Sequence, residues 1–313
     1  MATVFTIVTP VFALIVLGYS AGRFGWIGRD AAKGLTDFTF TIAVPAMLFR
    51  AMAKTELPAT GVQDIWLAFF GAAIVVWGLS TLATRWLIGR PALDAPSISM
   101  SASFGNVVML GIPLSLSAFG PTAAAPAALI VALHSPLLWL LATAHMAVAR
   151  SGDAAAGAWW SLLKGLVLDL SRNVIILAIL AGLCWRATGL ELLPVIAKLV
   201  GLLAQAGVPC ALMALGLSLV GFEIKGQSGT LALILVLKLV AMPAIAALLA
   251  AGVFGLAPVS AGVVILFAAM PTGANAYLFA SRSNRAANSA SGAVALSTVL
   301  SAATASAIIY VLK

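Results

Sequence analysis

The stretch SFGNVVMLGIPLSLSAFG, residues 103–120, is apolar enough to lie in a bilayer, yet its interior contains Gly105, Asn106, Gly111 and Pro113. Proline lacks the backbone N–H of a regular helix and clashes with the preceding turn, and glycine loosens what remains. Backbone groups freed in this way cannot face lipid and are tolerated only where protein or a watery cavity satisfies them. We therefore expect a broken helix that faces the protein interior.

The composition places the whole chain in a membrane. Of its 313 residues 63% are hydrophobic and only 8% are charged, and the mean hydropathy is +1.14. About 20 apolar residues form a helix that crosses the hydrocarbon, and the sequence contains ten such stretches. The fold predicted is an all-α integral membrane protein, whose spans one to ten are residues 2–22, 32–53, 64–88, 97–119, 122–149, 172–188, 193–221, 229–253, 257–280 and 289–312.

Composition also excludes several function classes. The net charge of +8 comes from basic residues scattered singly at the ends of the spans, which argues against a nucleic-acid partner. Cys184 and Cys210 lie in apolar runs without metal-ligand spacing, so no metal or cofactor is expected. The sequence lacks the catalytic motifs that an intramembrane enzyme needs, because it has no HExxH and no paired carboxylates within a span.

Lysine and arginine predict the orientation. Connections after odd-numbered spans and their flanks hold eleven of these residues and the opposite face holds five. By the positive-inside bias, the odd connections are cytoplasmic and both termini are outside. We expect a multi-pass protein of the cell inner membrane with both termini in the periplasm. The longest connection, residues 151–171, contains Trp159, Trp160 and Lys164, which are typical of an interfacial helix.

This connection divides the chain into residues 1–150 and 172–313, each with five predicted spans. The second span of each half carries a proline, Pro45 or Pro209, and so does the fourth, Pro113 or Pro271. Because five is odd, the two copies would be inverted. Pro45 and Pro209 are interpreted as kinks, whereas spans four and nine are predicted to be discontinuous helices that cross near the midplane of the membrane.

Inverted repeats with interrupted helices indicate the binding site of a transporter. Half-helix N-termini suit an anion and half-helix C-termini suit a cation. Asn106 and Asn275 are the predicted polar contacts, although membrane amides also serve as hydrogen bonds between helices. The residues expected to shape the crossing around them are Gly105, Gly111, Pro113, Pro271, Thr272 and Gly273.

At these residues the chain resembles the auxin efflux carrier family, in its bacterial malonate-permease-like branch. The resemblance covers almost the whole length and rests on VPAMLFRAMA in span two, SFGNVVMLGIPLSLSAFG in span four, GVPCALMALGLSL in span seven, LKLVAMPAIA in span eight, and MPTGANAYLFASRSN and SASGAVALSTVLSA at the end. It implies a fold similar to the bile-acid sodium symporters, with the crossing asparagine and prolines at Asn106, Pro113 and Pro271.

The resemblance also implies a mechanism. Spans one, two, six and seven would form a scaffold, through which the protein could form a homodimer. Spans three to five and eight to ten would form a mobile transport unit that carries organic anions by an elevator-like motion. In place of the Asn-Pro with which span six often opens in this family, the chain has Asn173 followed by Val174.

Three ionisable residues bear on ion coupling. Lys238 lies within span eight, where a charge is costly; it could compensate a carboxylate, stand in for a sodium ion, or snorkel to the interface. Asp37 and His134 are weaker candidates for proton coupling. Asp37 could instead be a solvated carboxylate at the interface, and His134 could be a histidine packed in the core.

The function predicted is a secondary transporter of a small organic anion, a carboxylate or dicarboxylate, that works by alternating access. The predicted crossing contains no acidic residue. This favours uniport, proton coupling or exchange over a sodium-coupled symporter of the same fold, although carbonyls and amides alone can bind sodium. A channel is a further alternative, but repeated broken helices around one site fit alternating access better.

Overall fold

The computed structural model describes residues 2–54, 61–151, 168 and 170–312. Most of the predicted interfacial segment, including Trp159, Trp160 and Lys164, lies outside these residues. Within them the chain is helical, and seven helical segments are long and apolar enough to cross a membrane by length and composition. Three shorter apolar helices, Val107–Phe119, Val174–Ala187 and Pro258–Ala268, fall in predicted spans four, six and nine. The protein is thus an all-helical membrane protein.

Several spans are single regular helices. Each runs for 22 to 28 residues, contains an apolar window long enough to cross a membrane, and closes the hydrogen bonds of its backbone within the helix. Pro209 lies inside one of them without interrupting it. These helices are α1 (Ala2–Arg23), α4 (Val62–Trp86), α7 (Ala124–Ser151), α10 (Pro194–Leu219) and α15 (Ala287–Leu312).

Two other spans combine α-helix with wider π-helical turns. Span two consists of α2 (Arg29–Phe38), η1 (Thr39–Ala43) and α3 (Val44–Lys54). Span eight consists of α11 (Ser228–Val236), η6 (Leu237–Ala241), α12 (Met242–Ala247) and η7 (Leu248–Val253). Both continue without a break.

The π turns explain how prolines are accommodated. The residue before Pro45 donates its N–H to a carbonyl five residues back, from Val44 to Thr39, and the same bond joins Ile112 to Val107 before Pro113. The wider turn relieves the clash that a proline ring makes with the preceding turn of an α-helix. Pro113 therefore lies in the first turn of α6 (Ile112–Phe119), which continues from η3 (Val107–Gly111).

This overturns one detail of the sequence interpretation. Span four is interrupted, as expected, but at residues 104–106 rather than at Pro113. The chain leaves α5 (Ala95–Ser103) in an extended conformation at Phe104 and re-enters a helix only after Asn106.

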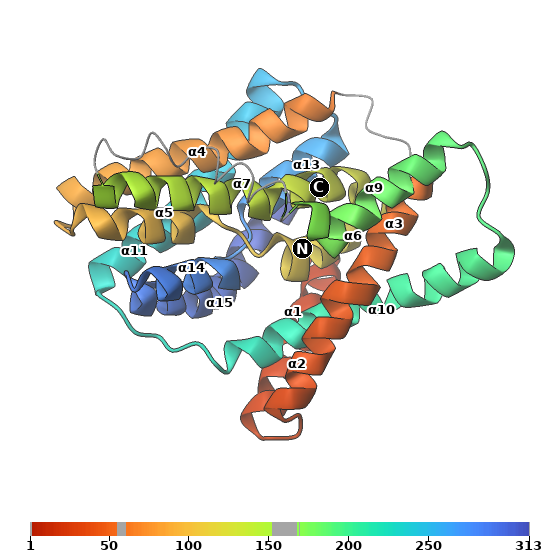
Figure 1. The fold of residues 1–313 in the computed structure, drawn as a ribbon, viewed down its shortest axis with the longest axis horizontal. Coiled ribbons are helices and arrows are strands. Elements are labelled where there is room, and N and C mark those ends of the chain that lie inside the picture. Colours follow the sequence, from red (N-terminus) through yellow and green to blue (C-terminus); the bar gives the residue numbers. More distant parts are fainter. Residues whose placement is uncertain (1, 55–60, 152–167, 169, 313) are drawn as a thin grey trace.

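The helices pack in two groups (Figure 1). In the first, α10 packs against α1 and α3, and α3 packs against α9 (Val174–Ala187). In the second, α4 packs against α5, α12 against α13 (Pro258–Ala268), and α14 (Ala274–Ser283) against both α5 and α15. Figure 1 shows α3, α9 and α10 on one side and α4, α5, α11 and α15 on the other.

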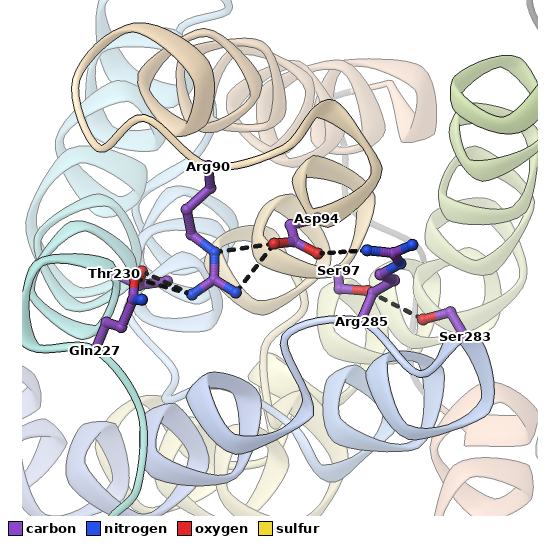
Figure 2. A network of polar contacts seen from close by, with 7 residues as sticks. All are labelled: Arg90, Asp94, Ser97, Gln227, Thr230, Ser283 and Arg285. Carbon is purple, nitrogen blue, oxygen red and sulfur yellow. Dashed lines mark hydrogen bonds and ion pairs between the residues drawn. The ribbon is translucent and has the colours of Figure 1, made fainter.

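A polar network joins three connections at one end of the second group (Figure 2). Asp94, which is buried, forms ion pairs with Arg90 at 3.0 Å and with Arg285 at 3.8 Å. Arg90 also donates to the side chains of Gln227 and Thr230 at the start of α11. The connections after spans three, seven and nine therefore lie together.

Close packing of α1 against α10 depends on a glycine, Gly216. A Cβ on Gly216 would stand 2.1 Å from the carbonyl oxygen of Ile15, whereas a Cβ on Gly78, in α4, would meet no atom within 4 Å. Gly216→Ala should destabilise the protein by about 1–3 kcal/mol, because the two backbones must separate. The measurement is the melting temperature in detergent. Gly78→Ala is the matched control and should leave it unchanged or slightly raised; equal effects of the two substitutions would contradict the packing.

Candidate functional site

The interruptions of spans four and nine meet in an antiparallel backbone pairing. Gly105 and Thr272 form an isolated β-bridge. The N–H of Asn106 donates to the carbonyl of Pro271 at 2.7 Å, and the N–H of Gly273 donates to the carbonyl of Phe104 at 3.0 Å. Two extended segments thus satisfy each other's backbone groups, which removes the cost of breaking helices in an apolar environment.

Small residues permit this close crossing. A Cβ on Gly105 would stand 3.2 Å from the Nζ of Lys238, and a Cβ on Gly273 would stand 2.9 Å from the ring of Phe104. Thr272 is buried and its side chain donates to the carbonyl of Ser101 at 2.9 Å, which ties the second interruption to α5. The crossing is therefore held by both backbone and side-chain bonds.

A cavity of about 340 Å³ lies against the crossing. This volume is at the lower end of the range of small-molecule sites. Its wall combines both interruptions with parts of α2, η1, α7, α9, α10 and α15. The polar side chains among its lining residues are Thr36, Asn106, His134, Ser135, Asn173, Ser218 and Asn275.

Three helices begin at this cavity among the described residues. The first N–H groups of a helix have no partner within the helix, and they form its positive dipole end. Val107 and Val108 open η3, Ala274 and Asn275 open α14, and all four residues line the cavity. The third helix, α9, begins directly after Asn173.

The asparagines at the cavity have different roles. Asn106 caps η3, because its Oδ1 accepts from the N–H of Met109 at 3.3 Å, and its NH₂ group remains for another partner. Asn275 is the second residue of α14 and donates to the hydroxyl of Ser135 at 3.5 Å. In the backbone pairing, Asn106 stands where Gly273 stands in the other interruption, so the two amides are not equivalent.

Asn173 is a cavity residue that the sequence analysis noted only as a departure from a family pattern. Its Oδ1 accepts from the N–H groups of Ile175 and Ile176, at 3.0 and 3.4 Å, and so caps α9. An asparagine directly before an apolar helical run is a typical N-cap. That signal could have identified the start of the helix, but not its place at the cavity.

His134 supports the crossing from the side of α7. Its Nε2 lies 3.0 Å from the carbonyl oxygen of Gly105. A carbonyl can only accept, so Nε2 carries the proton of this bond. The imidazole is buried between the rings of Phe69 and Phe104. The geometry is that of a packed histidine that positions the backbone of Gly105.

The other predicted site residues lie behind or outside the cavity wall. Gly111 is buried against the ring of Phe267, and Pro113 is buried in the first turn of α6. Pro271 contributes its carbonyl to the crossing. Asp37 is exposed on α2 and does not line the cavity, although its neighbour Thr36 does.

Lys238 is completely buried beside the crossing, at 0% exposure. Its Nζ donates to the carbonyl of Ala268 at 2.9 Å and contacts the sulfur of Met242 at 3.0 Å. Snorkelling to an interface is therefore wrong for this lysine, because its ammonium group turns inward to the end of α13.

Comparison with known proteins finds transporters. The profile of the family described as "Membrane transport protein" matches residues 3–309. A protein of Rhizobium meliloti (strain 1021) described as a "Putative malonate transporter" is 28% identical over 319 residues, covering 100% of this chain and 97% of the relative. An "Uncharacterized transporter" of Methanothermobacter thermautotrophicus is 24% identical over 300 residues, covering 94% of this chain and 93% of the relative. The chain therefore belongs to the membrane transport protein family, the family of the auxin efflux carriers.

Proposed function

We propose that this membrane transport protein is a secondary transporter that binds a small organic anion, a carboxylate or dicarboxylate, in the cavity at the crossing. The observation that carries the proposal is the convergence of the first turns of η3, α14 and α9 on one cavity. The positive dipole ends of the three helices favour a negative ligand. The caps already accept the N–H groups of Met109, Ile175 and Ile176, which leaves the opening residues of η3 and α14 as the backbone donors at the cavity. Among the described lining residues there is no carboxylate to repel it.

The size and polarity of the cavity support a short ligand. A volume of about 340 Å³ suits a molecule of a few carbon atoms with its water better than a large lipid-like anion. The amide of Asn106 and the hydroxyl group of Ser135, which accepts from Asn275, supply further donors. Malonate, named in the description of one relative, is the first ligand to test.

Alternating access of two inverted five-span halves, residues 1–150 and 172–313, is the mechanism that we propose. Its support is that the interrupted spans hold corresponding places in the two halves and pair antiparallel. The packing of α10 with α1 and α3, and of α3 with α9, supports a scaffold of spans one, two, six and seven. The other spans carry both interruptions and would move as the transport unit.

The geometry favours a carrier that does not use sodium. Within the described residues no carboxylate lines the cavity, and the carbonyl of Ala268 at the end of α13 is already occupied by an ammonium group. Such carbonyl ends are the groups that would otherwise suit a cation. Uniport, proton coupling and exchange remain the proposed modes, with a sodium-coupled symporter as the alternative.

Ligand-induced stabilisation tests the proposed function directly. Malonate should raise the melting temperature of the purified protein in sodium-free buffer, and added sodium should not increase the effect. A ligand at about 100 times its dissociation constant stabilises by about 2.7 kcal/mol. Malonamide, which is neutral and similar in shape, is the control. A panel of mono- and dicarboxylates none of which shifts the melting temperature more than its amide would contradict the proposal.

Asn106→Asp tests the site without removing the helix cap. Aspartate keeps the oxygen that accepts from Met109 and is favoured at an N-cap, but it places a negative charge at the proposed anion site. Anion affinity should fall at least about 10-fold, which corresponds to about 1.4 kcal/mol, while the melting temperature without ligand stays the same or rises. Asn288→Asp is the matched control, because Asn288 is an exposed residue in the first turn of α15. Unchanged anion affinity in Asn106→Asp would reject this cavity as the site.

A further inference from the structure

Lys238 is a charge that the proposed function does not yet use. It lies in the π turn η6 of span eight, far from either end of that span, and its side chain is fully buried. Placing a charged side chain at such depth costs at least about 2.5 kcal/mol unless something compensates it. This energetically costly charge lies next to the crossing.

The described residues compensate this charge only in part. The carbonyl of Ala268 and the sulfur of Met242 solvate the ammonium group. Ala268 ends α13, so the ammonium also meets the negative dipole end of that helix. A dipole end amounts to about half an elementary charge. None of the ion pairs found in the described part of the chain includes Lys238.

The position of the ammonium group relative to the cavity is defined by Gly105. Gly105 lines the cavity, and a Cβ on it would stand 3.2 Å from the Nζ of Lys238. Lys238 itself is not among the lining residues. A single backbone segment thus separates a buried positive charge from the cavity at which three helices begin.

We propose that Lys238 is the fixed counter-charge of the anion site, acting through the backbone of Gly105 without touching the ligand. This inference rests on the proposed function. It states what makes the site selective: the charge of Lys238 favours an anion over a neutral molecule of the same shape. Lys238 supplies a fixed positive charge near the ligand. A side chain larger than hydrogen at residue 105 would displace the ammonium group, which gives a reason for glycine there.

The same arrangement has a consequence for movement. Lys238, both interruptions and α14 all belong to the spans of the proposed transport unit. The positive charge therefore travels with the bound anion, and the loaded unit carries opposite charges close together. Because a paired charge is less costly in a low-dielectric environment than a single one, occupancy by an anion lowers the cost of carrying the buried lysine.

A charge series of one molecular shape tests the proposal. The ligands are malonate, its half-amide malonamate and the neutral malonamide, titrated calorimetrically into detergent-solubilised protein at neutral pH. The test variant is Lys238→Gln, whose amide NH₂ can still donate to the carbonyl of Ala268 while the charge is removed. Lys198→Gln, which removes an exposed lysine of α10, is the matched control.

The expected result is specific to charge. A unit charge acting across a short distance in a protein with an effective dielectric constant of about 20 changes affinity by about 10- to 100-fold. Lys238→Gln should weaken malonate and malonamate by that factor and change malonamide less than about threefold. Lys198→Gln should bind all three ligands like the parent. If Lys238→Gln does not stay folded, as judged by its melting temperature, Lys238→Met takes its place.

The outcomes separate the two proposals. A parent protein that binds malonamide as well as it binds both anions has no anion site, and this overturns the proposed function together with the role of Lys238. A parent that prefers the anions, with a preference that the neutral variants of Lys238 keep, overturns the role of Lys238 alone. A folded variant that weakens all three ligands equally also overturns it, because that result indicates a purely structural role.

Discussion

The structure depends on a short backbone pairing in which the interruption at Phe104–Asn106 and the interruption around Thr272 complete each other's hydrogen bonds. Hydrocarbon offers no partners for free backbone groups, so one broken helix alone would be costly. Two that cross satisfy the middle of each interruption and leave only the helix ends unpaired. The first residues of η3 and α14 line the cavity, so the requirement that permits the break also places helix N-termini at the candidate site.

Sequence reasoning located the elements of this fold better than their internal geometry. Apolar length predicts each of the seven long helical segments found in the described residues, and glycine with proline predicts that spans four and nine are interrupted. The place of the interruption in span four was wrong, because Pro113 was taken as its cause. A π turn absorbs Pro113 and Pro45 alike, and hydropathy contains no signal for the choice between a π turn and a break. The proposed repeat symmetry rests only on the order of the proline-containing spans in each half and on the backbone pairing of the two interruptions.

The candidate site shows the same limit. Asn106 and Asn275 were identified because each lies near an interruption, and both line the cavity. The bond from His134 to Gly105 joins segments far apart in the chain, and such a contact requires the tertiary arrangement. The cap that Asn173 forms is local, but the place of Asn173 at the cavity also depends on the tertiary arrangement. Lys238 was singled out because a lysine in an apolar span is unusual, but whether it snorkels or turns inward depends on the position of Ala268, which the sequence does not supply.

The proposed anion site, which is built from helix ends and amides, would have a physical advantage in the proposed carrier. An arginine that contacts a carboxylate directly forms two charge-assisted hydrogen bonds, and a ligand held in that way would leave slowly. Helix N-termini supply partial charges through fixed N–H groups, and a lysine behind the backbone adds attraction without a direct bond. Attraction is then spread over many weak contributions, each of which water can replace when the cavity opens. The arrangement suits binding on one side of the membrane and release on the other, because recognition of charge does not require a contact that must be broken all at once.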